Sequence, residues 1–107
     1  MITYLSLSRN GYEQKESVTR KYIRHYSKDV CDDGGTMFTV NVNFLRGLND
    51  IIRFDVSTYM CKQNGESVFV SYVYMDSETT IKNVEEFFVE MFYKMNFKHL
   101  KNGENDG

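Results

Sequence analysis

The sequence predicts an α+β fold in which a three-stranded antiparallel sheet, with room for a fourth strand, carries a long C-terminal helix on one face. Asn64-Gly65 stands between two segments of alternating apolar residues, which is the strongest short signal for a β-hairpin. Residues 37–45 alternate in the same way, and a helical periodicity begins at Ile81. The predicted element order is therefore (β)-α-β-β-β-α, in which the first strand is optional.

The optional strand is at residues 2–7, where apolar residues alternate only weakly. If it joins the sheet, we expect it beside residues 68–75, whose edge would otherwise be open to pairing with another chain. If it does not join the sheet, the open edge favours dimerisation.

A helix is predicted over about residues 12–27, because apolar residues recur there at helical spacing. These residues are Val18, Tyr22, Ile23 and Tyr26. The outer face would be basic with interleaved tyrosines, a mixture typical of surfaces that bind phosphates and bases or an acidic protein. A solvated helix face is the simpler interpretation. The candidates for a nucleic-acid or acidic partner are Lys15, Arg20, Lys21, Arg24 and Lys28.

Two hairpins are expected to join the three strands. In the first, Phe44 would lie opposite Ile52, which keeps the apolar residues of both strands on one face. In the second, a two-residue turn at Asn64-Gly65 would set Thr58 opposite Ser71. This register leaves apolar residues of the last strand on the face that the helix does not cover.

The C-terminal helix is expected to begin after an N-cap at Thr80 and to continue past Met95. Its main apolar stripe would lie on the sheet. A second, narrower stripe falls outside this arc, and a lone domain would not need it. This second stripe and the uncovered strand residues are the candidates for a protein interface: Val68, Val70, Tyr72, Tyr74, Val89, Tyr93 and Phe97.

The length of 107 residues and the formal charge of -2 indicate one domain that is not a general polyanion binder. We expect the domain to span residues 1–101, with a disordered tail at 102–107. No apolar run is long enough to cross a membrane, and residues 1–7 lack the features of a signal peptide, so a cytoplasmic protein is predicted. Cys31 and Cys61 are expected to be reduced thiols.

No motif indicates catalysis, a cofactor or a metal, and we expect a protein that is not an enzyme. The two histidines, His25 and His99, do not form a zinc motif with the two cysteines, because no pair has the close spacing of such sites. A Cys31 nucleophile served by His25 and Asp32 is the weaker hypothesis, since closeness in sequence is not catalytic geometry.

The α-β-β-β-α order resembles, in layout, double-stranded-RNA-binding domains and some small phage anti-CRISPR proteins. The lysine cluster that opens the last helix of the RNA-binding family has no counterpart in residues 80–86, which read TIKNVEE.

The chain lacks Ala, Pro and Trp, which favours an AT-rich source such as a phage. The predicted function is a protein-binding inhibitor, anti-CRISPR-like, that blocks a functional surface of a host defence protein and has the option of homodimerisation. The alternative is a nucleic-acid-binding module that uses the basic first helix.

Overall fold

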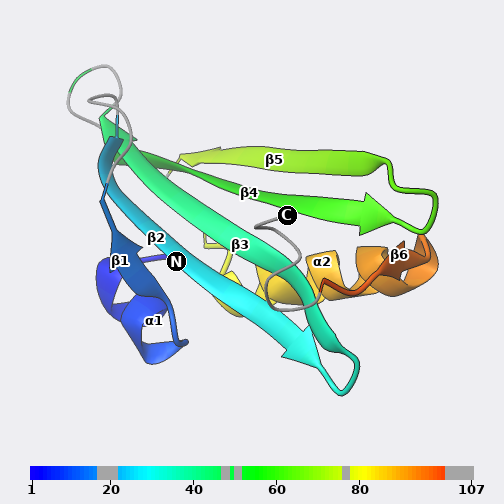
Figure 1. The fold of residues 1–107 in the computed structure, drawn as a ribbon. Helices are drawn as coiled ribbons and strands as arrows, with labels where there is room; N and C mark the ends of the chain where they lie inside the picture. Colours follow the sequence, from blue (N-terminus) through cyan, green and yellow to red (C-terminus); the bar gives the residue numbers. More distant parts are fainter. Residues whose placement is uncertain (17–21, 47–48, 50–51, 76–77, 101–107) are drawn as a thin grey trace.

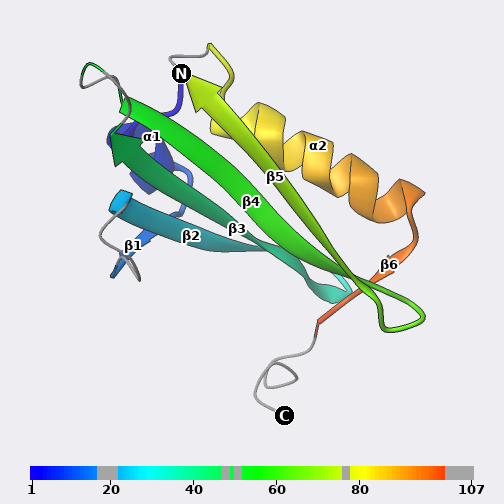
Figure 2. The same ribbon diagram turned by 90° about the horizontal axis from the view of Figure 1, so that it is seen from above.

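A computed structural model shows that the protein is mostly β-sheet (Figures 1 and 2). The structure describes residues 1–16, 22–46, 49, 52–75 and 78–100. One antiparallel sheet runs in chain order through β1 (Glu13–Lys15), β2 (Tyr22–Asp32), β3 (Gly35–Arg46), β4 (Ile52–Lys62) and β5 (Ser67–Met75), and β6 (Phe97–Lys98) pairs with β4. The helices are α1 (Tyr4–Arg9) and α2 (Ile81–Lys94). The predicted three-stranded sheet with a long C-terminal helix is therefore wrong. The predicted tail, residues 102–107, lies outside the described residues.

The face of the sheet on which α2 lies is called the covered face, and the opposite one the open face. The covered face holds most of the core, which is formed by even-numbered residues of the long strands and one side of α2. Phe38 of β3 meets Phe88 of α2 edge-on, with 5.8 Å between the ring centroids. The alternation in residues 37–45 predicted these inward positions correctly.

The prediction of a helix over residues 12–27 is wrong, because the described part of this segment forms β1 and the first half of β2. A spacing of four residues places side chains on one face of a strand as well as on one face of a helix, so the spacing did not distinguish the two. Tyr26 is buried opposite Val42 of β3, whereas Ile23 is exposed on the other face. Aromatic and β-branched residues favour a strand, and β3 offers a partner along most of β2.

The hairpin of β3 and β4 has the predicted faces but a different register. Phe44 lies opposite Phe54 instead of Ile52, and Val42 lies opposite Val56. This register differs from the predicted one by two residues. Because side chains alternate with a period of two, an even shift changes the pairs and keeps every side chain on its face.

The hairpin of β4 and β5 differs by one residue, because its loop contains three residues instead of two. Gly65 donates its N–H to the carbonyl of Lys62 at 2.9 Å, and Lys62 donates its own N–H to the carbonyl of Glu66 at 2.7 Å. Gly65 has a φ of 91°, in the left-handed region that favours glycine, whereas Asn64 has no positive φ. This is a type I turn followed by a G1 bulge, and not the predicted type I′ turn.

The extra loop residue turns β5 over. Thr58 lies opposite Val70 instead of Ser71, so Val70 faces α2, while Phe69 and Val73 lie on the open face. Val68, Val70 and Tyr72, which the prediction left uncovered, are thus on the covered face. Phe69 and Val73 are exposed on the open face, and Tyr72 is also partly exposed at the edge.

α2 begins where predicted, with the Thr80 side chain accepting a hydrogen bond from the N–H of Asn83 at 3.2 Å. It ends earlier than predicted, at Lys94. Asn96 has a φ of 57°, a conformation that asparagine tolerates and that turns the chain out of the helix. Phe97 therefore belongs to β6, where it is 3% exposed and packs on Phe92.

Residues 2–7 contribute a helix instead of the optional strand. Thr3 caps α1 through a reciprocal pair of hydrogen bonds with Ser6, which form a capping box with Ser in place of the usual Glu or Gln. The ring of Tyr4 packs on Tyr26 and Phe44, which places α1 beside β2 and β3. Figure 1 shows α1 beside β1 and β2, at the opposite edge of the sheet from β5, so this helix does not cover the edge of β5. The N-terminal ammonium of Met1 donates to the carbonyl of Glu78 at 3.3 Å, which lies after the end of β5.

Candidate functional site

The two edges of the sheet differ in how well they resist pairing with another strand. β1 has three residues, all exposed, and carries Glu13 and Lys15. β5 has nine residues without a charge or a proline. Edge strands are normally kept from pairing by shortness, charge or proline. Among the described residues no strand pairs with the outer side of β5, so this is the unprotected edge of the sheet.

The backbone groups that face outward along β5 follow from its register. The hydrogen bond from Lys62 to Glu66 marks that pair as hydrogen-bonded, and hydrogen-bonded pairs alternate with non-bonded ones in an antiparallel ladder. Even-numbered residues of β5 therefore bond β4. The N–H and C=O groups of Phe69, Ser71 and Val73 point away from β4.

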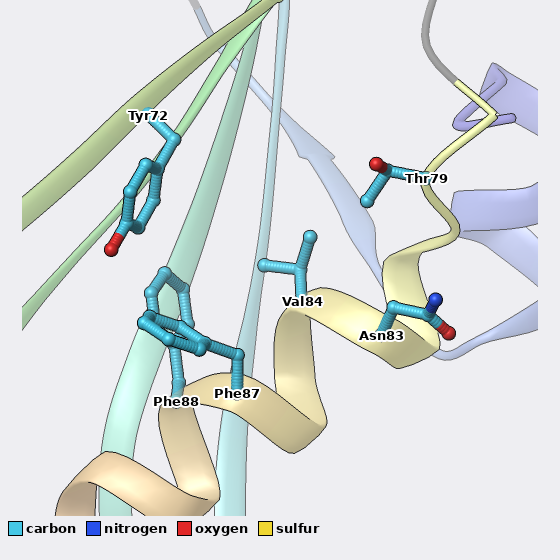
Figure 3. A pocket seen from close by; sticks show the side chains of 6 residues that line it. All are labelled: Tyr72, Thr79, Asn83, Val84, Phe87 and Phe88. Atoms are coloured by element: carbon cyan, nitrogen blue, oxygen red, sulfur yellow. The ribbon is translucent and has the colours of Figure 1, made fainter.

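A hollow of about 300 Å³ lies beside this edge, between β5 and the first turns of α2 (Figure 3). Tyr72 reaches into it from β5 and meets the ring of Phe87 edge-on at 5.7 Å between centroids. Phe87 is 44% exposed although it is a large apolar side chain. Figure 3 shows Thr79 and Asn83 at the opposite end of the hollow from Tyr72. The hollow thus has an aromatic end close to the edge strand and a polar end.

The open face carries further apolar surface along the same edge. Phe69 is 54% exposed and Val73 is 62% exposed. The ring of Phe69 lies 4.7 Å from that of Tyr59 on β4, which is also exposed. An incoming strand would consequently find apolar side chains on both faces of β5.

The predicted interface residues on β5 whose side chains are described lie on the covered face, not on the open one. Val68 and Val70 are half-buried against the core, and Tyr72 lines the hollow. The side chain of Tyr74 lies outside the described part of the chain.

The predicted interface residues near the C-terminus do not form one stripe. Val89 is half-buried against the core, and Phe97 is buried in β6. Tyr93 is exposed and its hydroxyl donates a hydrogen bond to Asp32. These residues therefore do not form the predicted second stripe of a helix, because α2 ends before Phe97.

The predicted basic residues that the structure describes, Lys15, Arg24 and Lys28, do not form one face of a helix, because they lie on strands. Lys28 binds Glu85 of α2, and the guanidinium of Arg24 lies 4.3 Å from the ring centroid of Tyr4, both on the covered side. Lys15 pairs with a glutamate of its own strand. The remaining two candidates, Arg20 and Lys21, lie outside the described residues.

Lys28 belongs to a half-buried polar cluster that ties β2 to α2. Its ammonium donates to both carboxylate oxygens of Glu85 at 3.1 Å, and the hydroxyl of Tyr12 donates to the same carboxylate at 2.7 Å. Burial, and then Glu85, raise the pKa of Tyr12 far above its usual value. All three groups satisfy one another, which is the arrangement of a structural cluster and not of a reactive one.

A second polar cluster joins the β2–β3 turn to the C-terminal part of the chain. Asp32 accepts hydrogen bonds from the hydroxyl of Tyr93 at 2.5 Å and from the N–H of Gly34 at 2.8 Å, and His99 Nε2 lies 2.7 Å from the same carboxylate. A Cβ atom at Gly34 would lie 2.9 Å from the His99 ring, so glycine permits this approach. The Tyr93 hydroxyl, ahead of Gly34 and His99, holds the pKa of Asp32 below its usual value, while burial works against them.

This cluster predicts a pH dependence of stability. A carboxylate with a depressed pKa in the folded state stabilises the fold above its unfolded pKa, and the contribution is lost as the pH falls through the folded pKa. We expect Asp32→Asn to lower the urea midpoint at about pH 5 and above, and the difference from the unchanged protein to vanish progressively below the usual Asp value of 3.8. Asp33→Asn removes a neighbouring exposed charge and should leave the midpoint nearly unchanged. Equal effects of the two variants would contradict this role of Asp32.

The structure separates the groups that the catalytic hypothesis combined. Cys31 and His25 lie six residues apart along β2, which corresponds to roughly 20 Å. The Cys31 sulfur instead lies 3.6 Å from the hydroxyl of Thr36, and His25 contacts Asn41. Within the described ranges, no three His, Cys, Asp or Glu side chains gather closely enough to hold a metal ion.

The sequence patterns did not point to the exposed residues of β5 or to the lining of the hollow: Phe69, Val73, Thr79, Asn83 and Phe87. The single signal for the β5 residues is the turn sequence, because Gln63-Asn64-Gly65 suits a three-residue loop as well as a two-residue one. The hollow has no sequence signal, since it depends on where α2 lies relative to β5.

A search for relatives finds no matching family model, curated protein or solved structure. Over the residues that the structure describes, neither helix has the length and apolar character needed to span a bilayer.

Proposed function

We propose that this protein is a non-enzymatic protein-binding module that accepts an extended segment of a partner along β5. The observation that carries the proposal is the uncharged nine-residue edge with its outward backbone groups. In recognition by strand addition, backbone hydrogen bonds supply affinity and neighbouring pockets supply specificity. The hollow of Tyr72 and Phe87 is such a pocket, and it suits an apolar or aromatic side chain of the incoming strand.

We extend the proposal to the biological role of an inhibitor. A chain without Ala and Pro fits a protein of a phage or mobile element with AT-rich genes. Occupation of an exposed strand or loop of a host defence protein would block that protein without any chemistry. The alternative of a nucleic-acid-binding helix loses its basis, because the described part of that segment is strand.

Capture experiments with matched variants test the proposal. Phe69→Lys combined with Val73→Lys places two charges on the edge. We expect the immobilised variant to retain at least tenfold less of the partner from a host extract than the unchanged protein does. Ile23→Lys introduces a charge on the same open face but on β2, three strands away from β5, and it should retain the partner. Amide hydrogen exchange on the purified complex should then show protection at Phe69, Ser71 and Val73. A partner retained equally by all three proteins would refute strand addition at β5.

A further inference from the structure

We infer that β5 also pairs with β5 of a second copy of this chain, antiparallel about a two-fold axis through Ser71. The inference rests on the proposed function, because it uses the same edge and names one occupant of it. Three features of β5 support it: the positions of the outward backbone groups, the pattern of its side chains and the absence of charge.

The outward backbone groups are those that a two-fold pair centred on Ser71 requires. In this register Phe69 lies opposite the partner's Val73, and Ser71 lies opposite the partner's Ser71. Each of these pairs consists of residues whose N–H and C=O groups point away from β4, so each exchanges two hydrogen bonds. A centre at Ser71 also lies at the middle of Ser67–Met75, so this register engages the whole strand.

The side chains of β5 complement themselves in the same register. On the open face, Phe69 meets the partner's Val73. On the covered face, Val70 meets the partner's Tyr72. Aromatic residues paired across strands with β-branched ones are favourable, and each face of this junction contains such pairs, with Ser71 meeting Ser71 at the centre of the open face. The exposed surfaces of Phe69 and Val73 would thereby lose contact with water.

Electrostatics does not oppose the pairing. β5 contains no charged residue, so no like charges meet across the axis. The other edge strand, β1, offers only three residues to such a junction. Because the axis is perpendicular to the sheet, both α2 helices lie on the same side of the joined sheet, and the two hollows beside Tyr72 become neighbours across the axis.

A charge-swap experiment tests the register. We expect light scattering of the unchanged protein to give twice the chain mass of 12.6 kDa at high concentration, with dissociation on roughly hundredfold dilution. Phe69→Lys with Val73→Lys places like charges opposite each other and should give the monomer mass. Phe69→Glu with Val73→Lys places opposite charges at the same positions and should restore the dimer. The two double variants burden the isolated fold similarly, and circular dichroism checks that both are folded.

Cysteine cross-linking provides a second readout. In a background of Cys31→Ser and Cys61→Ser, Ser71→Cys brings two sulfurs together at the axis, where Cα atoms about 5.5 Å apart permit a disulfide. Ser67→Cys places the same group on the same strand and face, but roughly 27 Å from its equivalent in the partner. We expect oxidation to link the first variant into a dimer at least tenfold more completely than the second.

The failure of this inference is distinguishable from failure of the proposed function. An unchanged protein that stays monomeric, or a dimer that the paired lysine substitutions leave intact, overturns the self-pairing. Equal cross-linking of the two cysteine variants overturns the register. If the unchanged protein is a monomer, but the variant with Phe69→Lys and Val73→Lys still loses the captured partner, β5 accepts a strand of another protein. Only the second copy of this chain is then ruled out as its occupant.

Discussion

Phe88→Ala is expected to lower the free energy of unfolding by about 3–5 kcal/mol. Phe88 is 0% exposed and lies between α2 and the sheet, where its ring meets Phe38. Truncation removes its contacts and leaves a cavity that the surrounding strands cannot close, because β3 is held on both sides by other strands. A loss of this size is a large part of the stability of a small domain.

The neighbouring Phe87 provides the control. Phe87→Ala removes the same atoms from the same helix, but from the half-exposed rim of the hollow, and should cost about 1 kcal/mol. Urea denaturation followed by circular dichroism measures both values. Similar losses for the two variants would show that α2 is rotated relative to the sheet, and with it the hollow beside β5.

The second large effect is expected at Glu85. Glu85→Ala should lower the free energy of unfolding by about 2–3 kcal/mol, because it leaves the Tyr12 hydroxyl buried without its acceptor and the Lys28 ammonium half-buried without its counter-ion. Glu86→Ala, one residue along the helix and exposed, should change it by less than about 0.5 kcal/mol.

A double-mutant cycle identifies the cause of the Glu85 effect. Tyr12→Phe should destabilise the unchanged protein and should cost less in the Glu85→Ala background, where the hydroxyl has already lost its acceptor. Additive losses would show that Glu85 does not act through the Tyr12 hydroxyl and would leave its ion pair with Lys28 as the cause. The cycle is read from urea midpoints at neutral pH, where the Tyr12 hydroxyl stays protonated.

The two polar clusters and the core explain how a small sheet holds a strand edge ready for a partner. Lys28 and Glu85 fix the first half of α2 to β2, and Asp32 fixes the residues after α2 to the β2–β3 turn. α2 is thereby held at both ends while it crosses the covered face. The hollow between α2 and β5 is consequently a property of a fixed helix, and its shape is available before any partner binds.

Part of the candidate site was visible in the sequence. The uncharged segment 68–75 and the consequence of leaving its edge without a neighbour were both predicted. The faces of its residues were not. A single residue more or less in the loop after Lys62 exchanges the two faces of β5, and Asn64-Gly65 is compatible with both loop lengths.

By itself the sequence determined the features that depend on neighbouring residues alone. The start of α2 at Thr80 follows from one cap, and the inward positions of residues 38–44 follow from strict alternation. Tertiary structure decided the features for which two local solutions are equally good. Tyr22 and Tyr26, four residues apart, suit a helix and a strand alike, and pairing with β3 made the segment a strand. Burial of Phe97 beside Phe92 favoured ending α2 at Lys94, because a core contact outweighs the small gain from one more helical turn.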